Sequence, residues 1–156
     1  MNYANKLEIA GQQVSLQEPT YFIADIAANH DGDLERAKDL IWKAKEAGAD
    51  CAKFQHFLSD KIVSAVGFST MGQSVSHQAK WNRSVSEIYE AYHTRRDWTP
   101  TLVKTCQEAG IHFMTTPYDL EAIDEFADIV PAFKIGSGDI TFSSAIERIA
   151  LVGKPV

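Results

Sequence analysis

The sequence lacks the features that mark a nucleic-acid-binding or membrane protein. It has no basic run, and its formal net charge is −6, which argues against nucleic acid as the main partner. No apolar stretch approaches the roughly 20 residues of a membrane-spanning helix. The N-terminus also has no basic start followed by an apolar core, as a signal peptide would. We therefore expect a cytoplasmic protein without a membrane partner.

Metal-binding and redox motifs are missing as well. Cys51 and Cys106 form no CxxC pair, so we expect both to be small buried side chains in a reducing cytosol. The segment "GSGD" is not followed by the GK[ST] of a nucleotide-binding P-loop. Four histidines show no HxxxH spacing, so we expect no complete metal site in this chain: His56, His77, His93 and His112.

What the sequence does contain is an alternation of apolar runs and amphipathic segments. An N-terminal hairpin is expected over 6–16, and residues 56–97 are the least regular part, with "VGFSTMGQSVSHQAKWNRS" (66–84) expected to be a loop over the site. Capping residues such as Asp33, and glycines such as Gly48, mark helix ends. Strands are predicted over 21–27, 50–57, 111–116 and 132–137, and helices over 34–47, 84–93, 100–109, 119–129 and 143–153.

This order predicts an α/β fold with a parallel sheet and right-handed crossovers. It gives about four βα units, whereas a (βα)8 TIM barrel needs about 250 residues. The chain is therefore either a small open α/β sheet or the first half of a barrel. Because "GKPV" stops where another apolar strand would begin, we expect the first half of a TIM barrel.

Two lysines lie inside apolar strands, Lys53 in "DCAKFQHF" and Lys134 in "PAFKIGSGD". Two ammonium groups facing one cavity would repel each other unless a polyanion lay between them. Ser137 and its flanking glycines add anion-binding groups. The pattern predicts a substrate that carries phosphate and carboxylate. The alternative is that each lysine pairs with a buried aspartate or extends to the rim of the sheet.

Other polar residues follow the same strand ends, where parallel α/β folds bind their ligands. Asp25 either faces the interior of the barrel or is the structural partner of a lysine. His30 is either a ligand or base, or a histidine that caps or packs a turn. The remaining candidates are Asn29, Gln55, Thr115, Thr116, Tyr118 and Asp139; the two threonines are equally compatible with ordinary strand positions.

Long ordered stretches of the sequence resemble the sialic acid synthase family, of the N-acetylneuraminate synthase type. The resemblance covers roughly residues 6–156 and, in the family, only the front half of the architecture. It is carried by "YFIADIAANHDGDLERAKDLIWKAKEAGADCAKFQ", "MTTPYDLEAIDEF", "FKIGSGDIT" and "GKPV".

The resemblance implies a barrel enzyme that condenses phosphoenolpyruvate with an N-acetylated aldose, N-acetylmannosamine or a related sugar. The products are a nonulosonic acid and phosphate. It places the phosphate at Lys134 and Ser137, and the carboxylate at Lys53 with Thr115 or Thr116. It also places Gln55, Asn29 and Tyr118 on the sugar side, and Asp139 at the attacking water.

The resemblance also implies a divalent metal, Mn²⁺ or Mg²⁺, held mainly by histidines beyond Val156. It further implies a homodimer at full length, with a C-terminal antifreeze-like domain that this chain lacks. Asp25 stands where the family usually has glutamate, which could alter the sugar accepted. We expect residues 1–156 alone to be inactive. Two alternatives remain open: a Schiff-base aldolase using either lysine, and a non-catalytic half-barrel that binds an anionic metabolite or a partner chain.

Overall fold

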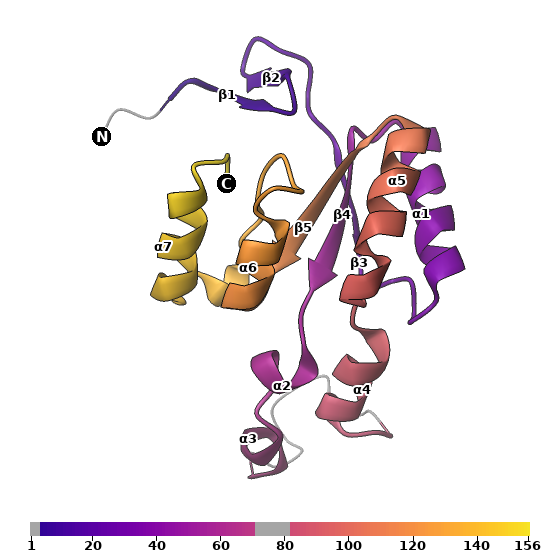
Figure 1. The fold of residues 1–156 in the computed structure, drawn as a ribbon, viewed down its shortest axis with the longest axis vertical. Coiled ribbons are helices and arrows are strands. Elements are labelled where there is room, and N and C mark those ends of the chain that lie inside the picture. Colours follow the sequence, from indigo (N-terminus) through magenta and orange to yellow (C-terminus); the bar gives the residue numbers. More distant parts are fainter. Residues whose placement is uncertain (1–3, 71–81) are drawn as a thin grey trace.

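A three-stranded parallel sheet lies at the centre of the computed structural model, which describes residues 4–70 and 82–156 (Figure 1). A separate two-stranded antiparallel hairpin precedes it. In chain order, the strands and helices are β1 (Lys6–Ile9), β2 (Gln12–Ser15), β3 (Ile23–Ala27), α1 (Leu34–Glu46), β4 (Cys51–His56), α2 (Ser59–Ile62), α3 (Ala65–Thr70), α4 (Val85–Tyr92), the 3-10 turn η2 (Arg96–Trp98), α5 (Thr99–Ala109), β5 (His112–Pro117), α6 (Leu120–Phe126), the 3-10 turn η3 (Ser137–Asp139) and α7 (Ser143–Val152).

The order of the sheet is β3-β4-β5, with β4 in the centre. Lys53 of β4 lies opposite Asp25 of β3 and Met114 of β5. The pairing of β3 with β4 is interrupted between Asp25 and Ala27, where the register shifts by one residue. Because side chains alternate between the two faces of a strand, this register decides which of them share a face.

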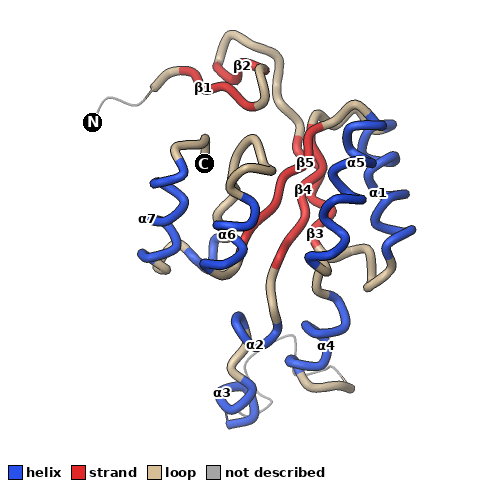
Figure 2. Tube along the Cα trace, in the orientation of Figure 1, coloured by secondary structure: helices blue, strands red, loops and turns tan. Residues whose placement is uncertain are grey.

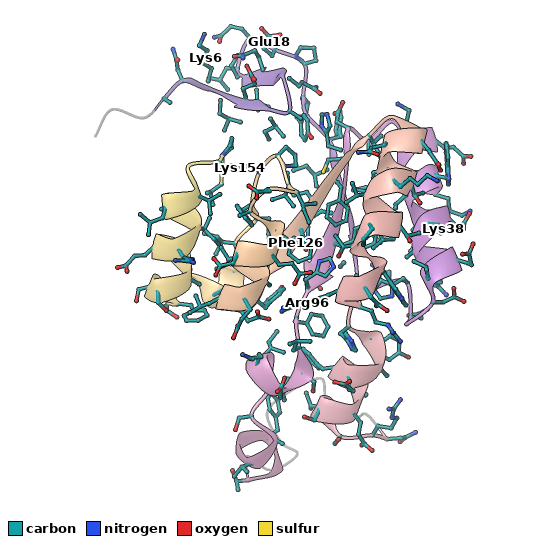
Figure 3. All side chains as sticks on the ribbon, viewed as in Figure 1. Lys6, Glu18, Lys38, Arg96, Phe126 and Lys154 are labelled. Carbon is teal, nitrogen blue, oxygen red and sulfur yellow. The ribbon has the colours of Figure 1, made fainter. Side chains whose placement is uncertain are left out.

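The larger apolar core covers one face of the sheet. Ala52 and Phe54 of β4 and Phe113 of β5 pack there against four helices: α1, α5, α6 and α7. Phe126 of α6 is fully buried between its helix and the sheet, which Figure 3 shows near the centre of the molecule. Figure 2 shows the strands running through the middle of the fold, with α6 and α7 to the left of them in this view and α1 and α5 to the right. This face is therefore occupied by packing.

The opposite face carries a smaller apolar cluster. It consists of Ile9 from the hairpin with Cys51, Met114 and Ala132. Cys51 and Met114 belong to the first half of their strands, so this cluster lies toward the amino ends of the sheet. Level with Met114, and beyond it toward the carboxyl ends, the same face carries polar side chains. We call this region the polar face and define it by Asp25, Lys53, Gln55, Thr116 and Tyr118.

Helix α1 begins at the predicted cap. The Asp33 side chain accepts hydrogen bonds from the backbone N–H groups of Glu35 and Arg36, at 2.8 and 3.1 Å. The helix ends at Glu46 with Ala47 as its C-cap, and Gly48 follows with a φ of +86°, as a residue after a helix end often does. Ser84 caps α4 in the same way, and the Glu87 carboxylate accepts a hydrogen bond from the Ser84 backbone N–H. The predicted ends of α1 and the predicted helix at 84–93 are confirmed.

Replacing Asp33 with alanine should lower the free energy of unfolding by about 1 kcal/mol, because two helix N–H groups lose their acceptor. Urea unfolding measures this. The matched control is Asp39→Ala in the same helix, whose exposed ion pair with Lys43 contributes little. Equal losses in the two variants would contradict the capping role.

Four sequence-based predictions of secondary structure were wrong in detail, two of them for strands. The strand expected over 132–137 is reduced to one bridge between Thr115 and Phe133, and "KPV" forms no strand, although the Phe133 N–H donates to the Pro155 carbonyl at 2.9 Å. Pro131 lacks a donor, and Gly136 leads directly into η3, so few residues remain for pairing. The full four-unit half-barrel is therefore not seen.

The other two differences concern helices. Residues 66–70, expected to be part of a loop, belong to α3, and the helix predicted over 119–129 ends at Phe126. Residues 71–81 of the same predicted loop lie outside the described residues. None of the helices in the described ranges is long and apolar enough to cross a membrane.

Candidate functional site

Lys53 is a buried charged residue of the polar face. Its side chain is only 4% exposed, and its Nζ lies 2.7 Å from Oδ1 of Asp25, whose own side chain is 62% exposed. The direction of this contact does not satisfy a hydrogen bond, and Nζ has no hydrogen-bond partner among the described residues. A buried ammonium group needs such partners to offset its lost hydration. The ion pair alone therefore leaves Lys53 able to bind an anion.

The two threonines of β5 point to opposite faces of the sheet. Thr115 lies opposite Phe54 on the helix-covered face, and its Oγ1 shares a hydrogen bond of 2.7 Å with Nδ1 of His56. Thr116 lies opposite Gln55 on the polar face, and its buried Oγ1 has no partner in the described part of the chain. The structure therefore groups Thr116, and not Thr115, with Lys53.

This difference predicts opposite consequences for two matched variants. Thr115→Val should lower the free energy of unfolding by about 1–3 kcal/mol, because it leaves a buried histidine nitrogen without a partner. Thr116→Val should leave stability unchanged or raise it, because an unpaired buried hydroxyl is replaced by a methyl group. Chemical denaturation of both variants measures this. A larger loss for Thr116→Val would show that the faces are assigned wrongly.

Gln55 and Tyr118 are joined across the carboxyl ends of β4 and β5. The Gln55 Nε2 donates a hydrogen bond of 2.9 Å to the Tyr118 hydroxyl oxygen. Burial, together with the negative charges of Asp139 and Asp25, raises the pKa of Tyr118 to about 12. The phenol is therefore protonated at neutral pH, and it lies near both of the predicted carboxylates.

The segment after Phe133 brings three further predicted residues to the same region. Lys134 follows Phe133, which pairs with Thr115 on the helix-covered face, so Lys134 belongs to the opposite face. Ser137 and Asp139 form the ends of η3, and Ser137 is exposed. Burial raises the pKa of Asp139 above its usual value, and the positive charge of Lys134 opposes part of that rise.

His30 and Asn29 are engaged in the loop after β3. His30 is fully buried: its Nδ1 accepts from the Gly32 backbone N–H at 3.1 Å, and its Nε2 lies 2.9 Å from the Thr94 hydroxyl. Both ring nitrogens are thus occupied, which matches the packing role considered for this histidine. Asn29 is exposed and donates from Nδ2 to the Ile26 carbonyl at 2.9 Å. Its amide oxygen has no partner among the described residues.

The sequence did not predict the buried polar contacts on the helix-covered face, which involve His56, Arg96 and Asp119. His56 is fully buried, and its ring centroid lies 4.3 Å from that of Phe126. Burial is the main cause of its low pKa, about 3, and the charge of Arg96 adds to it. Arg96, in turn, forms an ion pair with Asp119 at 2.6 Å, beside the start of α5 (Figure 3). The alternation of β4 alone could have assigned His56 to the face of Phe54.

Two other features could indicate a different site: a surface cavity and a cluster of metal-binding side chains. A cavity of about 670 Å³ lies between α2 and α4, but three carboxylates, Asp60, Glu87 and Glu90, line it against one arginine, Arg83. This charge balance is a poor match for an anion. Within residues 4–70 and 82–156, no group of three or more His, Cys, Asp or Glu is arranged to hold a metal ion. The described residues therefore do not fit a complete metal site.

Comparison with known proteins gives one family and many relatives. The NeuB family model matches residues 40–156. The N-acetylneuraminate-9-phosphate synthase of Homo sapiens is 33% identical over 147 residues, which cover 94% of this chain and 40% of that protein. The N,N'-diacetyllegionaminic acid synthase of Legionella pneumophila is 34% identical over 122 residues, covering 78% of this chain and 34% of that protein.

A solved structure supports the fold. The N-acetylneuraminic acid synthetase of Leptospira borgpetersenii serovar Hardjo-bovis superposes with a TM-score of 0.77 at 24% identity, covering 96% of this chain and 47% of that one. The chain thus spans less than half of the length of each of these three proteins.

Proposed function

The chain belongs to the NeuB family, and we propose that it forms part of a site that condenses phosphoenolpyruvate with an N-acetylated aldose, N-acetylmannosamine or a related sugar. The observation that carries the proposal is the buried Lys53 ammonium group, which has an ion-pair partner but no hydrogen bond in the described residues. The matched relatives named above are synthases of sialic-type acids.

The carboxylate of phosphoenolpyruvate would complete the partners of Lys53. Charge-assisted hydrogen bonds to an ammonium group are among the stronger ones, and they gain further where water is excluded. The unpartnered hydroxyl of Thr116 is the second donor on this face. We assign the carboxylate to Lys53 and Thr116 for this reason, and we leave Thr115 to its contact with His56.

The phosphate would lie toward Lys134 and Ser137, at the end of the polar face where η3 begins. Fixed positive charge there would stabilise the phosphate as it leaves. Gln55, Asn29 and Tyr118 would line the sugar side. In this arrangement, each lysine binds one of the two negatively charged groups of the same small molecule. The negative charge of the ligand then offsets the repulsion between the two lysines.

In the proposed reaction, C3 of the enol attacks the aldehyde carbon of the sugar, whose oxygen takes up a proton and becomes a hydroxyl, and a water molecule adds at C2. Asp139 would take one proton of that water, and phosphate then leaves from C2 as the new C2 hydroxyl gives up its proton and becomes the keto group. A base must be ionised, so the nearby charge of Lys134 assists Asp139 by favouring its carboxylate form. Asp25 would act indirectly, by holding the ammonium group of Lys53 in place.

We propose that a divalent metal, Mn²⁺ or Mg²⁺, is held mainly by residues outside these 156, since the described residues offer no cluster for it. A homodimer of the full-length protein and a cytoplasmic location are part of the same proposal. The free, buried thiols of Cys51 and Cys106 support a reducing location. Burial raises the pKa of both thiols to about 12, so neither is a reactive thiolate.

The contact with Asp25 disfavours the aldolase alternative. A Schiff-base lysine must lose its proton, whereas a carboxylate 2.7 Å away stabilises the protonated amine. Borohydride treatment with pyruvate should therefore leave Lys53 unmodified. A reduced adduct on Lys53, detected by mass spectrometry, would revive the alternative.

Calorimetric titration of the chain with phosphoenolpyruvate, pyruvate and inorganic phosphate tests the proposed ligand. If both anionic groups are held, phosphoenolpyruvate should bind at least about tenfold more tightly than either single-group anion, because each charged contact adds affinity. Equal affinities for phosphate and phosphoenolpyruvate would show that the carboxylate has no site.

A further inference from the structure

The hydroxyl group of Tyr118 accepts a hydrogen bond but donates none among the described residues. Its oxygen accepts the 2.9 Å hydrogen bond from Nε2 of Gln55, and its own proton has no acceptor among the described residues. Accepting this bond from a fixed neighbour limits the directions in which the hydroxyl can donate. Tyr118 is therefore an oriented donor at the carboxyl end of β5.

The Asp139 carboxylate is available as an acceptor for the Tyr118 hydroxyl. It takes part in no hydrogen bond or ion pair in the described part of the chain. Asp25, the other carboxylate near the phenol, is already paired with Lys53. Of the two acceptors, only Asp139 is thus without a partner.

Gly136 explains how these two groups come close to each other. A Cβ atom on this residue would lie 2.5 Å from Oδ2 of Asp139 and 3.4 Å from the hydroxyl oxygen of Tyr118. The carboxylate and the phenol thus flank the space that a side chain at 136 would fill. A Cβ atom on Gly138, two residues later, would have no other atom within 4 Å. The two glycines of "GSG" therefore have different roles.

We propose that Tyr118 is a positioning residue for Asp139: its hydroxyl, oriented by Gln55, donates toward the Asp139 carboxylate through the space left by Gly136. This inference rests on the proposed function, in which Asp139 takes a proton from water. A donor beside the carboxylate stabilises its charged form, which is the form that a base requires. The phenol itself stays protonated, because burial and the neighbouring carboxylates disfavour its ionisation.

The test is a pH titration of the full chain with ¹³C-labelled aspartate, following the carboxyl carbon of Asp139 by NMR. In Tyr118→Phe the donor is lost and the ring is kept. The midpoint of the Asp139 titration should then rise by about 0.5 pH units or more. The matched control is Tyr89→Phe, which removes a hydroxyl from another tyrosine whose ring packs against Phe57.

Gly136→Ala provides a second variant, because its Cβ would displace the Asp139 carboxylate; it should raise the same midpoint, whereas Gly138→Ala should not. An unchanged or lower midpoint in Tyr118→Phe would overturn the inference, as would an equal rise in Tyr89→Phe. This readout needs no substrate. Failure here is therefore distinct from failure of phosphoenolpyruvate binding, which would instead refute the proposed function.

Discussion

Replacing Lys53 with methionine should weaken phosphoenolpyruvate binding by about 100-fold. Methionine keeps the length and apolar stem of lysine but removes the charge and its N–H donors. Charge-assisted hydrogen bonds contribute about 1.5–3 kcal/mol, and about 2.7 kcal/mol corresponds to 100-fold in affinity. Calorimetric titration of the wild-type chain and the variant measures the change.

The same variant should not lose stability. The ammonium of Lys53 is buried without hydrogen bonds, while its partner Asp25 is largely exposed and can be hydrated alone. Removing the buried charge should leave the free energy of unfolding unchanged or raise it. The matched control is Lys104→Met, on the exposed surface of α5, which should change neither property. Full binding by Lys53→Met, or an equal loss in the control, would rule out Lys53 as the carboxylate site.

Lowering the pH from 7 to 5 should reduce the free energy of unfolding by about 2 kcal/mol through His56. Burial lowers the pKa of His56 from 6.5 to about 3 in the folded chain. Between these two values, protons bind the unfolded state and not the folded one. The stabilising effect is therefore complete above pH 6.5 and is lost progressively as the pH falls toward 3.

Urea unfolding at pH 7 and pH 5 measures this loss, and ¹⁵N NMR of the His56 ring in the folded chain identifies its source. The ring should remain neutral at pH 5. The chosen window lies above the usual pKa of aspartate and glutamate, so most carboxylates contribute little to the difference. A His56 ring that titrates near 6.5 in the folded chain, or equal stability at both pH values, would contradict the role assigned to burial.

Helices with clear end signals were predictable from the sequence. Asp33 and Gly48 mark the ends of α1, because capping is a local interaction between neighbouring residues. The strand expected at 132–137 failed for the opposite reason. Strand pairing depends on neighbours that are distant in the sequence, and Phe133 meets β5 at a single bridge.

The site was predictable as a set of residue types, and less so as a geometry. The alternation of β4 is enough to place Lys53 and Gln55 on one face. The division between Thr115 and Thr116 required the register of β5 against β4, which periodicity does not reveal for two adjacent threonines. The partner of Lys53 likewise depended on the register between β3 and β4, which places Asp25 opposite it.

The crystal structure of this chain with bound phosphoenolpyruvate is the most direct test of the proposed site. We predict that the carboxylate lies within hydrogen-bonding distance of Lys53 Nζ and Thr116 Oγ1, with the phosphate toward Lys134 and Ser137. Phosphoenolpyruvate bound elsewhere, or bound with its phosphate on Lys53, would contradict the central claim that the carboxylate site is the Lys53 ammonium, which is ion-paired with Asp25 but has no hydrogen bond among the described residues.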